Sequence, residues 1–176
     1  MNPESEASGY KALLQSAIGK RLARVGYGCL AGEIDEGEDV ASVDSYIGGE
    51  VELAFHDGPV LFLTWAENVG WPDAFSLAVH TRSSFLPGSI RLLDASSLDL
   101  WQNTLGHVLE GVAMVGWNST PHVVRFDFDN SSILVGTSDK TTFSDADDVL
   151  VLPYEPGVVE GADCLWSLGC LRSPAT

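Results

Sequence analysis

The sequence predicts an α+β fold, mostly antiparallel β, in which a short helix followed by a β-meander occurs twice. Three observations predict it: apolar residues at helical spacing before two glycines, short segments of period-two alternation separated by turn residues, and two internal sequence matches in the same order. At 176 residues, with 45% hydrophobic and 19% charged residues, the chain can bury a core and lies outside the composition of disordered proteins. We therefore expect a single domain, residues 1–176.

The first helix is predicted by apolar residues that recur at i, i+3, i+4, i+7 and i+8 and so share one helix face. These residues are Tyr10, Leu13, Leu14, Ala17 and Ile18. Ser8 is placed to cap the start of this helix, and Gly19 follows where a left-handed residue ends a helix at no steric cost.

A shorter second helix is expected between Ser97, which is placed to cap it, and Gly106, which would end it. Its apolar residues are Leu98, Leu100, Trp101 and Leu105. Because Trp101 shares a face with the leucines, we expect it in the core.

Strands are predicted where apolar and polar residues alternate, because successive side chains of a strand point to opposite faces. Turn residues in His-Asp-Gly-Pro and Asp-Asn-Ser-Ser indicate two hairpins. The predicted strands are residues 51–55, 60–65, 75–80, 124–128, 133–136 and 149–152. The apolar tail between Cys164 and Leu171 is expected to dock as an edge strand or short helix, or else to offer an oligomer contact.

Two internal matches predict a duplicated unit. Residues 13–25 align without a gap on residues 100–112, and residues 51–62 align on residues 124–135, which sets Val60 on Ile133. The predicted units are repeat 1 at about 8–85, repeat 2 at about 96–153 and a C-terminal tail at 154–176.

An acidic insertion is predicted in repeat 1. The offset between the copies is 87 residues in the first match and 73 in the second, so repeat 1 carries 14 extra residues. We place this acidic insertion at residues 29–48, and it contains Gly-Glu-Ile-Asp-Glu-Gly-Glu-Asp at residues 32–39. A loop present in only one copy is not required by the shared fold, which favours a role in recognition.

The formal net charge is −16, from 25 acidic and 9 basic residues. Such a field repels nucleic acid and anionic membrane and steers cationic partners, although charge can also serve solubility alone. The N-terminal sequence carries acids where a secretory signal would carry positive charge, so we expect a cytoplasmic protein. Cys29, Cys164 and Cys170 show no metal or redox spacing, which is typical of free thiols.

The candidate partner-binding residues combine the clustered acids with one tryptophan in a Gly/Pro turn, because aromatic anchors and charge commonly share contact surfaces. They are Glu33, Asp35, Glu36, Glu38, Asp39, Asp44 and Trp71. Trp71 has an alternative role as a plug at the open end of the sheet.

No calcium loop, helical histidine pair, nucleophile elbow or phosphate-binding loop occurs, so we expect no metal, no cofactor and no enzyme. The leading hypothesis is a non-catalytic acidic binding protein for a basic macromolecule, such as an immunity or inhibitor protein for a bacterial toxin, for example a nuclease. The main alternative is a ligand-binding or hydrolytic domain with a pocket between the repeats. Its predicted lining is Trp65, Trp71, His80 and Asp129. A third is an acidic subunit that acts only by self-association; the sequence leaves the oligomeric state open.

Overall fold

A computed structural model gives the fold. It describes residues 3–32, 37, 39–43, 46–67, 75–117, 120–138, 147–154 and 166–172, and for residues 3–8, 42, 46, 115–117, 120–121 and 166–172 it describes the backbone alone.

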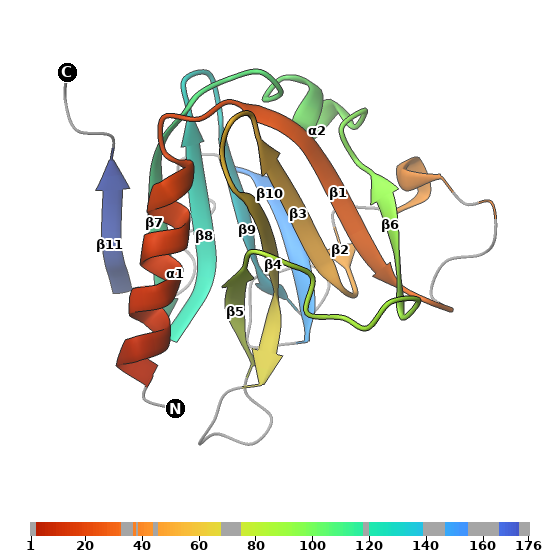
Figure 1. Ribbon diagram of the computed structural model, residues 1–176, viewed down its shortest axis with the longest axis horizontal. Coiled ribbons are helices and arrows are strands. Elements are labelled where there is room, and N and C mark those ends of the chain that lie inside the picture. The colour runs from red at the N-terminus through yellow and green to blue at the C-terminus, as the bar shows by residue number, and fades with distance from the viewer. Residues whose placement is uncertain are drawn as a thin grey trace.

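The described strands form two sheets that face each other, and their pairings are antiparallel (Figure 1). Sheet 1 has the order β5-β4-β3-β1-β6. Its strands are β1 (Leu22–Leu30), β3 (Glu50–Phe55), β4 (Val60–Glu67), β5 (Phe75–His80) and β6 (Ile90–Asp94). Sheet 2 has the order β11-β7-β8-β9-β10-β2. Its strands are β2 (Tyr46–Ile47), β7 (Leu109–Trp117), β8 (Thr120–Phe128), β9 (Ser132–Ser138), β10 (Asp148–Pro153) and β11 (Trp166–Arg172). The fold is sheet-rich α+β, as predicted.

Each sheet contains a four-stranded meander with the same connections. In sheet 1 the meander is β1, β3, β4 and β5, and β6 returns to pair with β1. In sheet 2 the meander is β7, β8, β9 and β10, and β11 returns to pair with β7. The helix α1 (Pro3–Ala17) precedes the first meander, and α2 (Asp99–Gln102) precedes the second. The first meander makes an excursion, because β2 and the 3-10 helix η1 (Val40–Ser42) lie between β1 and β3. The strand β2 pairs with β10 of sheet 2.

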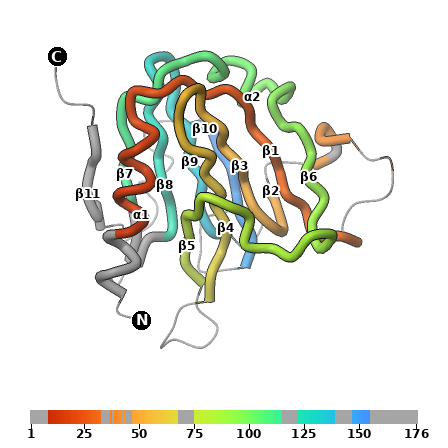
Figure 2. The backbone as a smooth tube through the Cα atoms, viewed as in Figure 1, coloured from red at the N-terminus to blue at the C-terminus, as the bar shows by residue number. Residues whose placement is uncertain are grey.

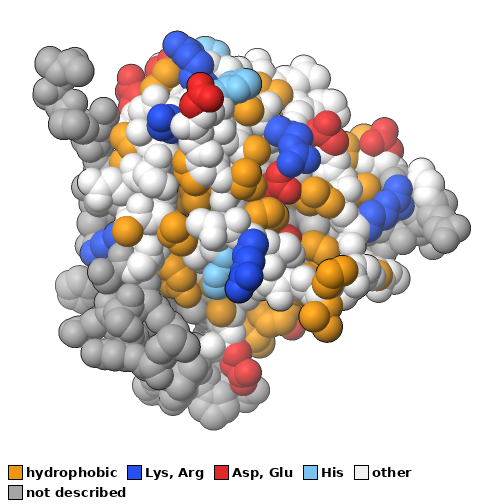
Figure 3. All heavy atoms as spheres, viewed as in Figure 1, with side chains coloured by type: hydrophobic (Ala, Val, Ile, Leu, Met, Phe, Trp, Pro, Cys, Tyr) orange, Lys and Arg blue, Asp and Glu red, His pale blue; other side chains and the backbone are white. Residues whose placement is uncertain are grey.

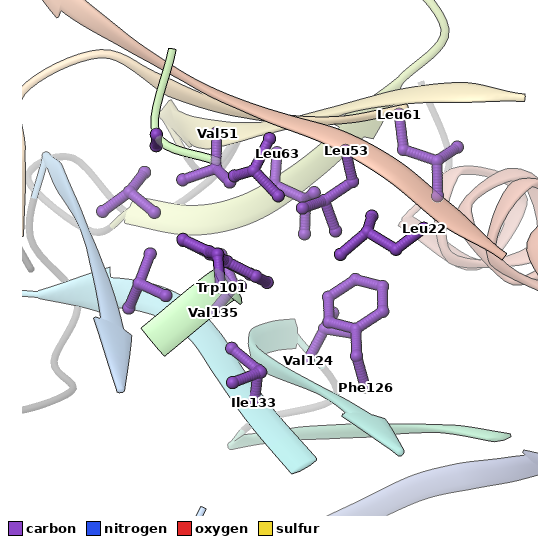
Figure 4. Close-up of a cluster of buried hydrophobic side chains, with 14 of the residues drawn as sticks. Leu22, Val51, Leu53, Leu61, Leu63, Trp101, Val124, Phe126, Ile133 and Val135 are labelled. Atoms are coloured by element: carbon purple, nitrogen blue, oxygen red, sulfur yellow. The ribbon is translucent and has the colours of Figure 1, made fainter. Parts of the chain in front are cut away.

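The core lies between the two sheets (Figure 4). Sheet 1 contributes Val51, Leu53, Leu61 and Leu63, and sheet 2 contributes Val124, Phe126, Ile133 and Val135. The helix α1 packs against β5, β7 and β8 at one side of the sandwich, as the backbone trace also shows (Figure 2). Its buried residues Leu14 and Ala17 close the core there.

The two sheets are joined at the start of β1 and β7 by residues 19–22 and 106–109, which we call the junction. The two segments exchange four backbone hydrogen bonds. These bonds run from Gly19 N–H to Leu109 O (2.8 Å), Gly106 N–H to Leu22 O (2.8 Å), Leu22 N–H to His107 O (3.1 Å) and Leu109 N–H to Lys20 O (2.9 Å). Each segment therefore donates to and accepts from the other.

The helix boundaries differ from the prediction. The helix α1 starts at Pro3, so Ser8 lies inside it and does not cap it; proline in the first turn followed by acids is a favourable helix start. The predicted cap of α2 is also wrong, since Leu98 occupies the N-cap without a side-chain bond. The buried Ala95 is tied to β1 by its N–H, and the chain turns there before α2 begins. The left-handed conformation predicted for Gly19 is confirmed, with a φ of 82°. Gly106 also has a positive φ, 78°, but it does not end α2 as predicted, because that helix already ends at Gln102.

The predicted strands are present, and four strands that the pattern does not reveal join them: β1, β2, β6 and β7. Two glycines obscure β1, because glycine weakens a strand signal. A Cβ at Gly26 would lie 2.8 Å from Leu92 Cδ1, and one at Gly28 would lie 2.9 Å from Glu50 Cγ. The glycines thus let neighbouring side chains lie across β1. The tail forms β11, an edge strand of sheet 2, which was one of the predicted alternatives.

The ungapped match of the two hairpins is off by one residue. Leu53 pairs with Leu61 in sheet 1, whereas Phe126 pairs with Ile133 in sheet 2. The match aligns Ile133 with Val60, but Ile133 is buried in the core, whereas Val60 is 36% exposed. Leu61 is therefore the counterpart of Ile133, because the second hairpin has a shorter connection.

The predicted core position of Trp101 is confirmed, since its side chain is fully buried between the sheets (Figure 4). Its Nε1–H donates to the hydroxyl of the equally buried Tyr27 on β1 at 2.7 Å. Burial raises the pKa of Tyr27, so the hydroxyl remains neutral. This bond connects α2 to sheet 1.

Tyr27→Phe should lower the free energy of unfolding by about 1–3 kcal/mol, because it leaves the buried indole N–H of Trp101 without this acceptor. Urea unfolding followed by tryptophan fluorescence measures the change. Unchanged stability would mean that the bond contributes nothing to the packing of α2.

Candidate functional site

Most of the predicted partner-binding residues lie outside the described residues. These are Glu33, Asp35, Glu36, Glu38, Asp44 and Trp71. Asp39 is described: it is exposed, and its carboxylate accepts a hydrogen bond from the Val40 N–H at 2.7 Å at the start of η1. Asp39 thus has a local structural role besides its charge.

The framework holds the chain on both sides of the acidic segment, which we define as residues 33–38. Before it, the Ala31 N–H donates to the Ser89 carbonyl oxygen at 2.9 Å. After it, Val40 is buried in the core, with 4% of its surface exposed. The acidic segment therefore connects two fixed points of the sandwich.

The described side chains comprise twelve acids and seven bases, a net of −5 out of the total of −16. Two of the twelve acids, Glu50 and Glu52, are buried. Residues 33–39, most of which lie outside the described residues, hold five carboxylates in seven positions.

Of the residues predicted to line a pocket between the repeats, Trp71 lies outside the described residues, and the other three do not come together. Trp65 of β4 packs against the core and the rings of Phe75 and Phe85. His80 ends β5 on the opposite face of sheet 1, where it contacts the Tyr10 ring and where burial lowers its pKa. Asp129 lies beyond β8, next to the junction.

Asp129 and His107 share a hydrogen bond, with 2.6 Å between Oδ1 and Nδ1. Both side chains are partly exposed, at 41% for His107 and 36% for Asp129. Among the described residues, no hydroxyl or thiol hydrogen-bonds to His107, so the pair does not extend into a nucleophile–base arrangement. The described residues also contain no group of three or more side chains suited to a metal ion.

The structure reveals a buried acidic pair that the sequence pattern did not indicate. Glu50 and Glu52 of β3 lie on the outer face of sheet 1, the face turned away from sheet 2, and are 0% and 3% exposed. Alternation correctly assigned Glu52 to the face opposite the core, but both glutamates are covered there. Residues 81–89, which we call the strap, run from β5 to β6 across part of this face, and Ser83 and Ser84 of the strap lie next to Glu50 (Figure 1).

The two buried glutamates differ in their partners. Glu52 accepts a hydrogen bond from the guanidinium of Arg24, which compensates its charge. Both carboxyl oxygens of Glu50 are buried without a hydrogen bond of normal geometry among the described residues. The burial raises the pKa of Glu50; the nearby Ser83 hydroxyl and Ser84 N–H offset part of this effect, and the charge of Glu52 adds to it. Glu50 is therefore the most unusual ionisable group of the described chain.

Hydrophobic side chains gather on the same outer face, with Lys and Arg side chains among them (Figure 3). The exposed large hydrophobic residues of the described chain all belong to it. They are Val60 (36% exposed), Leu86 (77%) and Leu92 (44%).

No protein-family model, curated protein or solved structure matches the chain. No helix among the described residues is long and apolar enough to cross a membrane.

Glu50→Gln should raise the free energy of unfolding at neutral pH and remove part of its pH dependence. The folded wild type keeps a proton on Glu50 above pH 4.5, the ordinary pKa of the group, whereas the unfolded chain loses it. Wild-type stability should thus fall as the pH rises from 4.5 through the raised pKa, and the variant should not share this loss.

Urea unfolding between pH 4.5 and 8.5 tests this, with the exposed Glu67→Gln of β4 as the matched control. The stability difference between Glu50→Gln and wild type should grow with pH, and Glu67→Gln should follow wild type. A difference that stays constant over this range would show that Glu50 ionises normally in the folded protein.

Proposed function

We propose that the protein is a non-catalytic acidic binding protein that neutralises a basic macromolecular partner. The supporting observation is the local density of charge: residues 33–39 hold five carboxylates in seven positions and no basic residue. The acidic segment runs between fixed points at Ala31 and Val40, and a recognition loop on a rigid scaffold has this arrangement.

Electrostatic attraction would act first, by steering the partner to the acidic segment at a rate that falls with salt. Carboxylates would then occupy the positions at which the partner binds phosphates. An immunity or inhibitor protein that blocks a toxin in the cytoplasm, such as a nuclease with a positively charged cleft, would work in this way. The charge selects basic partners as a class, and the toxin is the most specific form of this proposal.

We also infer that the two sheets derive from pseudo-repeats. The 87-residue offset of the helix match relates Gly19 to Gly106 and Leu22 to Leu109, so it maps each bond of the junction onto another. The 73-residue offset relates His56 to Asp129, whose N–H groups donate to Arg21 and Val108, again 87 residues apart. In this interpretation the excursion through η1 and β2, with its acids, is the feature that distinguishes the first unit.

Neutralising the acidic segment should abolish partner capture or slow association at least tenfold, because the steering charge is lost. The test variant combines Glu33→Gln, Asp35→Asn, Glu36→Gln and Glu38→Gln, and retains Asp39 because it caps η1. The control variant removes the same charge from exposed sites elsewhere with Asp57→Asn, Glu67→Gln, Glu110→Gln and Asp147→Asn.

Wild type and both variants serve as baits in a native lysate at low salt, with elution by a salt gradient and identification by mass spectrometry. A basic protein should bind wild type and control in stoichiometric amount and be lost from the test variant, while all three baits keep the same thermal stability. The proposal fails if no protein binds stoichiometrically, or if test and control variants lose it equally.

A further inference from the structure

The strap is fixed to the rest of the protein at both sides. Ser89 accepts the hydrogen bond from the Ala31 N–H, and the Phe85 ring contacts Trp65 at 6.4 Å between centroids. Between these contacts the chain turns, with the Ser89 N–H donating to the Leu86 carbonyl oxygen at 3.0 Å and Gly88 at a φ of 87°. Leu86 projects from this turn into solvent. The strap is thus a surface segment that crosses the sheet without being a strand of it.

Glu50 is enclosed beneath the strap by a close fit. A Cβ atom added to Gly28 would lie 2.9 Å from the Cγ of Glu50 and 3.0 Å from the Cδ1 of Ile90. The side chain therefore lies across β1 beside Ile90, and none of its surface is exposed. Thr64, opposite Glu50 on β4, gives its hydroxyl hydrogen to the Gly49 carbonyl oxygen.

Little in this enclosure compensates a negative charge on Glu50. The charged neighbour on β3 is Glu52, which repels it, and Arg24 of β1 is already bonded to Glu52. The strap faces Glu50 with the hydroxyl and N–H dipoles of Ser83 and Ser84, while Arg82 is exposed to solvent. Ile90 of β6 is apolar. An ionised Glu50 would thus be a buried charge without a counter-ion among the described residues, a costly arrangement.

We propose that the strap is a proton-controlled cover, which closes over Glu50 when its carboxyl group is protonated and is released when that group ionises. Protonated Glu50 is neutral and tolerates burial, whereas ionised Glu50 gains hydration when the strap opens. The strap is the element that can yield, because it is held by surface contacts while β1 and β3 are central in the sheet. Its release uncovers the carboxylate of Glu50. This mechanism does not depend on the identity of any partner.

Hydrogen exchange of the strap measures its opening directly. Because ionisation and opening are linked, the opening constant should rise by up to tenfold per pH unit between 4.5 and the raised pKa of Glu50, and then level off. In peptides that cover residues 81–89, we expect the wild-type protection factor to fall at least tenfold between pH 4.5 and pH 8, after correction for the intrinsic pH dependence of exchange.

Glu50→Gln should hold the protection factor constant, and Glu67→Gln should behave as wild type. Glu50→Met also lacks the ionisable group and has a side chain of similar length. It should give the same result as Glu50→Gln, and it serves as the test if the amide of Gln disturbs folding. His80→Gln should keep the wild-type dependence, which separates Glu50 from the other ionisable group with a shifted pKa near the strap. The proposal is overturned if wild type shows no fall, if the fall persists in both Glu50 variants, or if His80→Gln removes it.

Discussion

The reciprocal hydrogen bonds of the junction are the constraint on which the sandwich depends. These bonds hold the starts of β1 and β7 side by side. They therefore fix, at the first residues of both strands, which face of each sheet is turned towards the other sheet. Gly19 and Gly106 make this possible, because both have positive φ, a conformation costly for other residues, directly before the strands. The helices α1 and α2 each precede one segment of the junction, and the buried Trp101 and Leu14 fill the space between the sheets.

Two segments connect fixed points of this framework. The acidic segment links Ala31 to Val40 along the chain, and the strap crosses the outer face of sheet 1. The first carries four carboxylates in six positions, and the second covers Glu50, a buried carboxyl group without a counter-ion among the described residues. Such a buried group costs stability, which is common where a protein serves binding or regulation.

The sequence predicted features whose signal is local. Alternation at Val51, Leu53 and Phe55 depends on immediate neighbours and one buried face, so β3 was predicted correctly, as was the left-handed Gly19. The strand β1 was missed because its glycines weaken the strand pattern. Gly28 leaves room for the side chains of Glu50 and Ile90, which are distant in sequence and lie next to Gly28 only in the folded sheet. The burial of Glu50 depends on the strap, which lies about 30 residues later in the chain. The sequence around Glu50 therefore does not indicate that its side chain is buried. Asp129 could not be separated from Trp65 without knowing which ends of the sandwich they occupy.

Amide hydrogen exchange of Gly19, Leu22, Gly106 and Leu109, followed by NMR, would show most directly whether the junction makes the two sheets one cooperative unit. All four amides donate across the junction, so each must open for exchange. We expect all four to exchange only through global unfolding, with the free energy that denaturant unfolding gives. Exchange of these amides at a clearly lower free energy would mean that the sheets separate while still folded, and the junction would then not be the constraint that holds the sandwich together.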